Sequence, residues 1–114
     1  MNLPRTELLQ AQLDAVRLRL SLMADDPAFL GHFPGMPVLA GVIQIDWALQ
    51  LARLHLRVRQ RTAADFQLRC SRLIVPDRAL LLELRLNRAR HRLEFTYWLD
   101  GERASVGNLR LEPA

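Results

Sequence analysis

One stretch of this chain has the pattern of a buried helix, and almost everything after it has the pattern of β-strands. From Val42 to Val58, apolar residues cover nearly the whole circumference of a helix, which predicts burial on most sides. Neighbouring stretches alternate apolar and polar residues with a period of two, which is typical of half-buried strands. One buried helix among several alternating strands predicts an α+β domain whose antiparallel sheet packs around the helix.

The strand alternation occurs in five stretches of the sequence. They are residues 16–22, 66–71, 80–87, 93–99 and 103–111. The pair Asp100-Gly101, between the last two stretches, predicts a tight two-residue hairpin. The alternation slips near Arg72 and again near Gly107, and each slip predicts a β-bulge.

The N-terminal residues have a different spacing. Leu8, Leu9 and Leu13 lie at helical intervals, and Pro4 suits the first turn of a helix. We therefore expect a short helix over residues 6–12, ahead of the first strand.

Length and composition are those of an ordinary globular domain. We expect the 114 residues, 1–114, to form a single domain with one core. Cys70 is the only cysteine, so no intrachain disulfide can form; a reducing compartment fits best, and we expect Cys70 to be a small core residue. No signal peptide is evident, and polar residues interrupt the apolar stretch 42–58, so we expect a cytoplasmic protein without a membrane-spanning helix.

Charge narrows the choice of partners only slightly. The net charge of +4 arises from sixteen basic residues, all of them arginine, against twelve acidic ones. A positive surface is compatible with an acidic partner such as a nucleic acid or a carrier protein. Aromatic residues are few and no known nucleic-acid-binding signature appears, so we expect no nucleic-acid partner.

The most unusual residues lie just before and within the predicted helix. The segment 31–41 contains His32, two prolines and three glycines, and a carboxylate, Asp46, follows inside the apolar stretch. Proline restricts the backbone and glycine permits close approach, as in a catalytic loop that leads into a helix. Asp46 shares one helical face with Gln50, Arg53 and Arg57. Periodicity alone favours that face as the solvated side of the helix.

The loop and helix together resemble a known family. Residues 31–38, Gly41-Val42, Asp46 and Gln50 resemble the active-site segment of 3-hydroxyacyl-acyl-carrier-protein dehydratases of the FabA and FabZ type, and residues 41–48 are closest to the ApeI-like dehydratases of aryl polyene assembly. The resemblance implies the hotdog fold, in which a curled antiparallel sheet wraps one long central helix. The order of elements extends it from about residue 16 to residue 111.

The resemblance also implies a divided chemistry. His32 matches the family's catalytic histidine, and Asp46, fourteen positions later, matches its catalytic carboxylate. A neutral imidazole suits removal of the C2 proton from a 3-hydroxyacyl thioester near neutral pH. A carboxyl in an apolar helix has its charged form disfavoured, which raises its pKa and suits it to protonate the departing C3 hydroxyl. No metal or organic cofactor is needed.

Three further positions match residues that bind or orient substrate in the family. Gly41 matches the glycine whose amide polarises the thioester carbonyl, Val38 the residue whose carbonyl orients the histidine, and Gln50 a glutamine one turn beyond the carboxylate, able to hold it by a hydrogen bond. The chain departs from the family at Ala40, where proline usually precedes the glycine.

In such dehydratases the site forms between two subunits. We therefore expect a homodimer, or a heterodimer with a related hotdog subunit, in which His32 of one chain faces Asp46 of the other. The substrate partner would be an acyl carrier protein carrying a 3-hydroxyacyl group, and Arg53, Arg57 and Arg59 are candidates to receive it. Two alternatives stay open. One is a non-catalytic hotdog subunit, supported by Ala40; the other is a hotdog acyl thioesterase, which has no need of the segment His32-Phe33-Pro34-Gly35.

Overall fold

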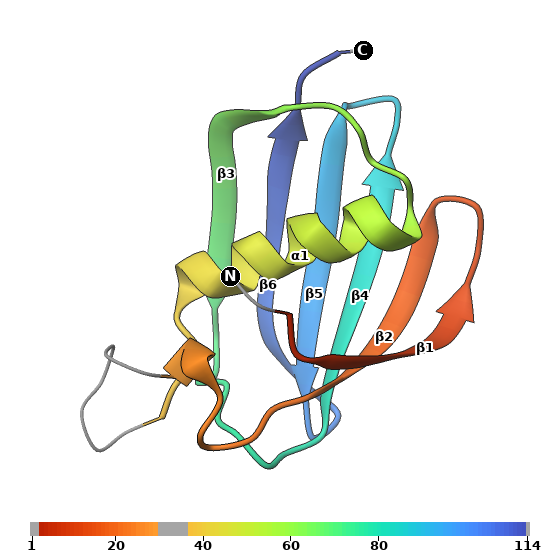
Figure 1. Ribbon diagram of the computed structural model, residues 1–114. Coiled ribbons are helices and arrows are strands. Elements are labelled where there is room, and N and C mark those ends of the chain that lie inside the picture. Colours follow the sequence, from red (N-terminus) through yellow and green to blue (C-terminus); the bar gives the residue numbers. More distant parts are fainter. Residues whose placement is uncertain (1–2, 30–36, 114) are drawn as a thin grey trace.

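The computed structural model describes residues 3–29 and 37–113 and shows a long α-helix crossing a curved sheet (Figure 1). In chain order the elements are β1 (Arg5–Ala11), β2 (Ala15–Ser21), the short 3-10 helix η1 (Pro27–Phe29), α1 (Gly41–His55), β3 (Thr62–Cys70), β4 (Leu80–Asn87), β5 (Arg92–Leu99) and β6 (Glu102–Leu111). The catalytic candidate His32 lies outside the described residues.

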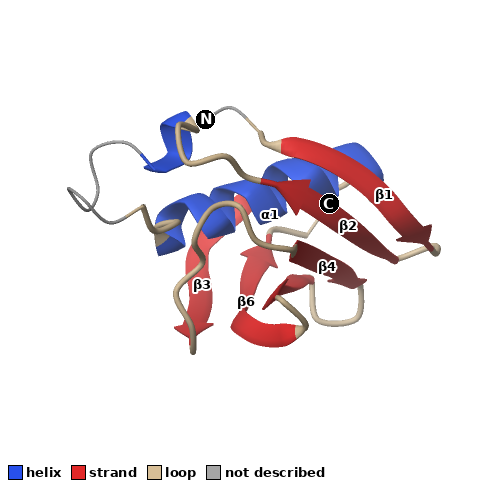
Figure 2. Cartoon of the chain, turned by 90° about the horizontal axis from the view of Figure 1, so that it is seen from below, coloured by secondary structure: helices blue, strands red, loops and turns tan. Residues whose placement is uncertain are grey.

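All strand pairs of the described sheet are antiparallel, and the strand order is β1-β2-β4-β5-β6-β3. Strands β1 and β3 are therefore the two edges. Seen along the sheet, the strands curl around α1, which lies in the concave side (Figure 2). This is the hotdog arrangement that the resemblance predicted.

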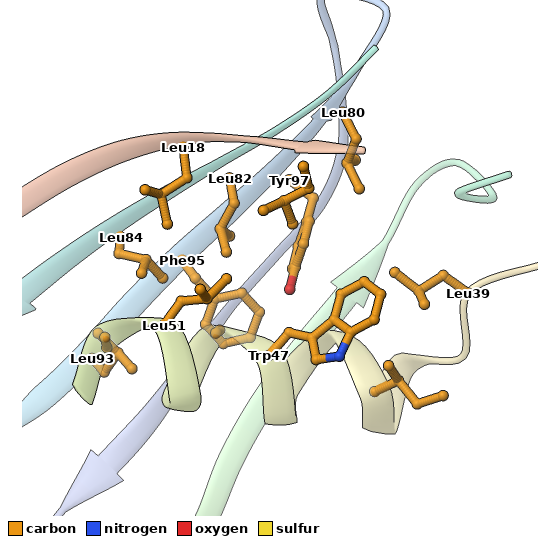
Figure 3. Packing of buried hydrophobic residues seen from close by; sticks show 14 of the residues in the cluster. Leu18, Leu39, Trp47, Leu51, Leu80, Leu82, Leu84, Leu93, Phe95 and Tyr97 are labelled. Atoms are coloured by element: carbon orange, nitrogen blue, oxygen red, sulfur yellow. The ribbon is translucent and has the colours of Figure 1, made fainter. Parts of the chain in front are cut away.

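The core lies between α1 and the inner face of the sheet. In β4 and β5 every second residue is buried, and the two strands pair without a shift from Leu80↔Leu99 to Asn87↔Arg92. Trp47 and Leu51 of α1 are fully buried, and Figure 3 shows Leu51 beside Phe95 and Trp47 near Tyr97. The period-two prediction for β2, β4 and β5 is thus confirmed, because the sheet buries one face only.

Asp100 and Gly101 form the predicted hairpin between β5 and β6. Both have positive φ, 50° and 80°, which is the geometry of the tight hairpin turn. Gly107, in contrast, is not a bulge. It pairs regularly with Phe95 and Leu68, and a Cβ there would lie 2.5 Å from the Phe95 ring. The bulge of β6 is at Ala104, which has no partner between the pairs Tyr97↔Ser105 and Trp98↔Arg103.

The N-terminal helix predicted over residues 6–12 is wrong, because this segment is strand β1, paired antiparallel to β2. The pairing shifts between Leu8 and Gln10, so that Leu9 is an extra residue in the ladder. Because the bulge adds one residue to the strand, the leucines of β1 do not alternate with a period of two. Their spacing therefore resembles that of a helix.

Helix α1 is shorter than predicted and less buried. It ends at His55 rather than Val58, and Arg57 follows with φ of 55°, so Arg57 does not share the helical face. Val42 and Leu54 are 69% and 66% exposed in the single chain, contrary to the predicted burial of the helix on most sides.

Two further expectations concern the membrane and the cysteine. None of the described helices has the length and apolar content that a membrane span requires. Cys70, expected in the core, is exposed on the edge strand β3.

Candidate active site

The backbone that leads into α1 is extended and then turns sharply. The amide of Leu39 donates to the carbonyl of Ile74 at 2.8 Å, which fixes the chain beside the segment that precedes β4. Ala40 is the N-cap, with φ −65° and ψ 148°, and its side chain makes no capping hydrogen bond. Its carbonyl accepts from the amides of Ile43 and Gln44, each at 3.1 Å. The two amides that precede Ile43 in the helix, those of Gly41 and Val42, have no acceptor within the helix and can serve a ligand.

Gly41 is closely packed from the side of β3. A Cβ at this position would lie 2.8 Å from Cδ2 of Leu68. Any side chain here would therefore displace Leu68 from the helix start. The absence of a side chain lets the edge strand approach, while Val38 just before the turn is buried.

Gln44, in the first turn of α1, is the centre of a buried polar cluster. Its side chain is 3% exposed; Nε2 donates to the carbonyl of Leu39 at 3.0 Å, and Oε1 accepts from the hydroxyl of Ser105 at 2.6 Å. Its main-chain carbonyl accepts from the hydroxyl of Tyr97 at 2.7 Å. These contacts connect the helix to β5, β6 and the preceding loop.

Asp46 lies half a turn beyond Gln44 and is half-buried. Its Oδ2 accepts a hydrogen bond of 2.5 Å from Nε2 of Gln50, one turn on, as the spacing predicted. The carboxylate of Asp46 also influences Tyr97 in the core. The pKa of Tyr97 is raised well above its usual value, chiefly by burial and secondarily by the negative charge of Asp46. The carboxyl is therefore oriented by a neutral amide in a site that is only partly open to water.

The polar face of α1 changes character along its length. Asp46 and Gln50 are half-buried, whereas Arg53 is exposed and Arg57 lies beyond the helix. The face is therefore more than the solvated side of the helix that its periodicity suggested. Its first half is a partly enclosed carboxylate–amide pair.

Four of the predicted site residues are described: Val38 lies in the loop just before α1, and Gly41, Asp46 and Gln50 lie on α1 itself. His32 is outside the described residues, so its position opposite Asp46 of a neighbouring subunit stays a prediction. Sequence reasoning missed the cluster around Gln44. The available signal was a glutamine between Ile43 and Ile45 on a face otherwise buried, since a buried amide needs partners.

The fold and the site together define a class of protein: a hotdog protein whose central helix begins at a glycine and carries a carboxylate in its first half. Residues 9–108 match the ApeI-like family, described as ApeI dehydratase. The chain belongs to this ApeI-like dehydratase family.

A curated relative gives a similar result. The chain is 29% identical over 99 residues to the 3-hydroxyacyl-[acyl-carrier-protein] dehydratase FabZ of Thermomicrobium roseum. The match covers 78% of this chain and 66%, just under two thirds, of the relative's length.

Solved structures of similar shape include both dehydratases and thioesterases. The dehydratase heterocomplex ApeI:P from Xenorhabdus doucetiae matches with a TM-score of 0.88 and 30% identity, over 96% of this chain and 98% of that chain. A hypothetical thioesterase with coenzyme A from Streptococcus pneumoniae matches with a TM-score of 0.70 over 92% and 82% of the two chains. Its identity is 10%, so this second likeness shows the fold alone.

Proposed function

We propose that this protein dehydrates 3-hydroxyacyl thioesters carried on an acyl carrier protein and releases trans-2-enoyl thioesters. The observation that carries the proposal is the match of residues 9–108 to the dehydratase family. The partly enclosed pair Asp46–Gln50, which begins about one and a half turns beyond Gly41, supports it, because the reaction needs an oriented proton donor near an amide that can bind the thioester oxygen.

The proposed reaction moves one proton on each side of the substrate. His32 takes the C2 proton while the thioester oxygen, bound by the Gly41 amide, carries the developing negative charge. Asp46 gives its proton to the C3 hydroxyl, the C3–O bond breaks and water leaves, so that C2 and C3 become doubly bonded. The carbonyl of Val38 orients His32, and Gln50 holds Asp46. The proton on His32 then returns to the carboxylate through solvent.

The proposal includes a second subunit. In it, His32 of one chain faces Asp46 of the other, so that both residues act on one substrate. The likeness to the dehydratase heterocomplex ApeI:P supports a heterodimer with a related hotdog subunit, and a homodimer is the alternative that we propose beside it. Exposed Val42 and Leu54 on α1, and the open edge of β3 with its exposed Phe66, are apolar surface that a partner would cover.

The FabZ relative supports a place in fatty acid biosynthesis. The alternative pathway, aryl polyene assembly, is the one implied by the resemblance of residues 41–48. Both use the same bond chemistry, so the assay below applies to either. We place the protein in the cytoplasm, where carrier-bound acyl chains are extended.

The test is dehydration of purified 3-hydroxyacyl carrier protein, followed by mass spectrometry for loss of water. Wild type should form the enoyl product, and His32→Ala should lose about 10²–10⁴-fold in kcat because the general base is gone. Release of free acid would instead identify a thioesterase. Formation of enoyl product at the wild-type rate by His32→Ala would overturn the assigned base.

One observation favours a second candidate function, a non-catalytic subunit that completes a partner's site. One structure of similar shape, ApeI:P, is a dehydratase heterocomplex. Absence of turnover by the isolated chain, followed by turnover after addition of a related hotdog dehydratase, would support this role. In that mixture, Asp46→Asn in this chain should leave turnover unchanged if the chain is non-catalytic, whereas a loss of turnover would show that it contributes the acid.

A further inference from the structure

We propose that Gln44 is a positioning residue: its side chain fixes the backbone from Leu39 to Gly41, so that the Gly41 amide keeps a constant direction. The activity readout rests on the proposed function. The role itself follows from contacts on the chain and is also tested without substrate.

The turn before α1 lacks the usual means of support. An N-cap residue normally accepts a hydrogen bond from a first-turn amide through its own side chain, and Ala40 cannot. Its φ of −65° is the value that a proline ring would impose, but alanine does not impose it. The conformation must therefore be held by its surroundings.

Gln44 supplies that support from inside the helix. Its Nε2 donates to the carbonyl of Leu39 at 3.0 Å, which connects the first turn back to the residue just before the N-cap. The main-chain amide of the same residue donates to the carbonyl of Ala40. Two successive carbonyls of the turn are thus bound by one residue, and their rotation is restricted on both sides of the Ala40 peptide.

The support is itself anchored to the sheet. Oε1 of Gln44 accepts from Ser105 on β6, and its main-chain carbonyl accepts from Tyr97 on β5. Figure 3 shows the Tyr97 hydroxyl directed at α1, beside Trp47. Ser105 and Tyr97 are both fully buried, so neither bond competes with water. The first turn therefore cannot rotate without breaking buried hydrogen bonds.

The decisive experiment combines a loss with a rescue. Gln44→Met keeps the volume of the side chain and removes both side-chain hydrogen bonds. The double variant Gln44→Met/Ala40→Pro restores the restriction on φ at residue 40 by a proline ring instead. Within the described chain, Ala40 donates no main-chain hydrogen bond that a proline would remove. Leu93→Val, a buried change near the far end of the helix in Figure 3, is the control for a simple loss of stability.

We expect Gln44→Met to lower kcat about tenfold to a hundredfold with KM nearly unchanged, because a misdirected amide weakens the transition state more than binding. The double variant should recover most of that loss, and Leu93→Val should keep the wild-type kcat at a temperature where it is folded. The proposal is overturned if Gln44→Met matches Leu93→Val in kcat, or if proline at position 40 restores no activity.

Hydrogen exchange separates this proposal from the proposed reaction. The amides of Ile43 and Gln44, which donate to Ala40, should exchange about tenfold or more faster in Gln44→Met and return toward wild type in the double variant. A wild type without dehydratase activity but with this exchange pattern refutes the reaction and keeps the positioning role. Unchanged exchange refutes the positioning role whatever the activity.

Discussion

The two ends of helix α1 are held by different forces. At the first turn, Gln44 makes three hydrogen bonds that reach the preceding loop, β5 and β6. Toward the last turn, Leu51, Ala52 and Leu56 are buried in the apolar core, and Leu56 caps the helix through its backbone amide to Ala52 at 2.8 Å.

The contacts at the two ends of the helix differ in how closely they specify its orientation. Apolar burial stabilises a helix in proportion to the area removed from water and does not specify orientation closely. Buried hydrogen bonds have preferred angles, so they specify which way a turn faces. Gly41 and Asp46 lie toward the end that is held by directed contacts. We infer that the second half of α1 chiefly stabilises the fold and the first half chiefly positions reacting groups.

The largest expected effect tests that division directly. Asp46→Asn retains shape but cannot donate the proton, so kcat should fall about 10²–10⁴-fold. His55→Gln, a comparable change in the last turn of the same helix, should leave kcat within about threefold, because it is remote from the acid. Steady-state dehydration of the carrier-bound substrate measures both. An equal loss in the two variants would mean that the ends of the helix do not differ in role.

How far the sequence predicted this molecule depended on the range of the contacts involved. The strands β2, β4 and β5 and the helix were evident, because each buries one face against a single core and so repeats with a regular period. Strand β1 was not predicted, because it depends on pairing with β2 and contains an extra residue, Leu9. Neither feature can be inferred from the spacing of the leucines within this segment.

The site follows the same rule. The pair Asp46–Gln50 is a contact one helical turn long, and it was found from spacing. In the cluster at Gln44, Tyr97 is separated from Gln44 by 53 positions in the sequence and Ser105 by 61 positions. No local pattern could therefore place either residue beside Gln44. Gly107 was misread for a related reason, because the Phe95 ring that requires a glycine there belongs to another strand.

The second prediction concerns the apolar end. Leu51 is 1% exposed, so Leu51→Ala should lower the free energy of unfolding by about 2–5 kcal/mol through lost burial and a residual cavity. Leu54→Ala, three residues on but 66% exposed, should cost under about 0.5 kcal/mol in the single chain. Urea unfolding of both proteins gives the comparison. Equal costs would show that Leu54 is covered in solution, and unfolding at several protein concentrations would identify a subunit interface.

The smallest effect concerns the polar end and depends on pH. Tyr97 is the only tyrosine, and burial raises its pKa above the ordinary value of about 10. Between those two pKa values the unfolded chain loses the phenolic proton and the folded chain keeps it, so stability should fall as pH rises above about 10. At about pH 11 the loss should be roughly 1–1.5 kcal/mol, and Tyr97→Phe should lack it. Urea unfolding across this range measures the difference, with tyrosinate absorbance as an independent titration of the folded protein. Ionisation of the folded protein at the ordinary pKa, or an equal alkaline loss in Tyr97→Phe, would show that Tyr97 does not hold the first turn of α1 as a buried donor.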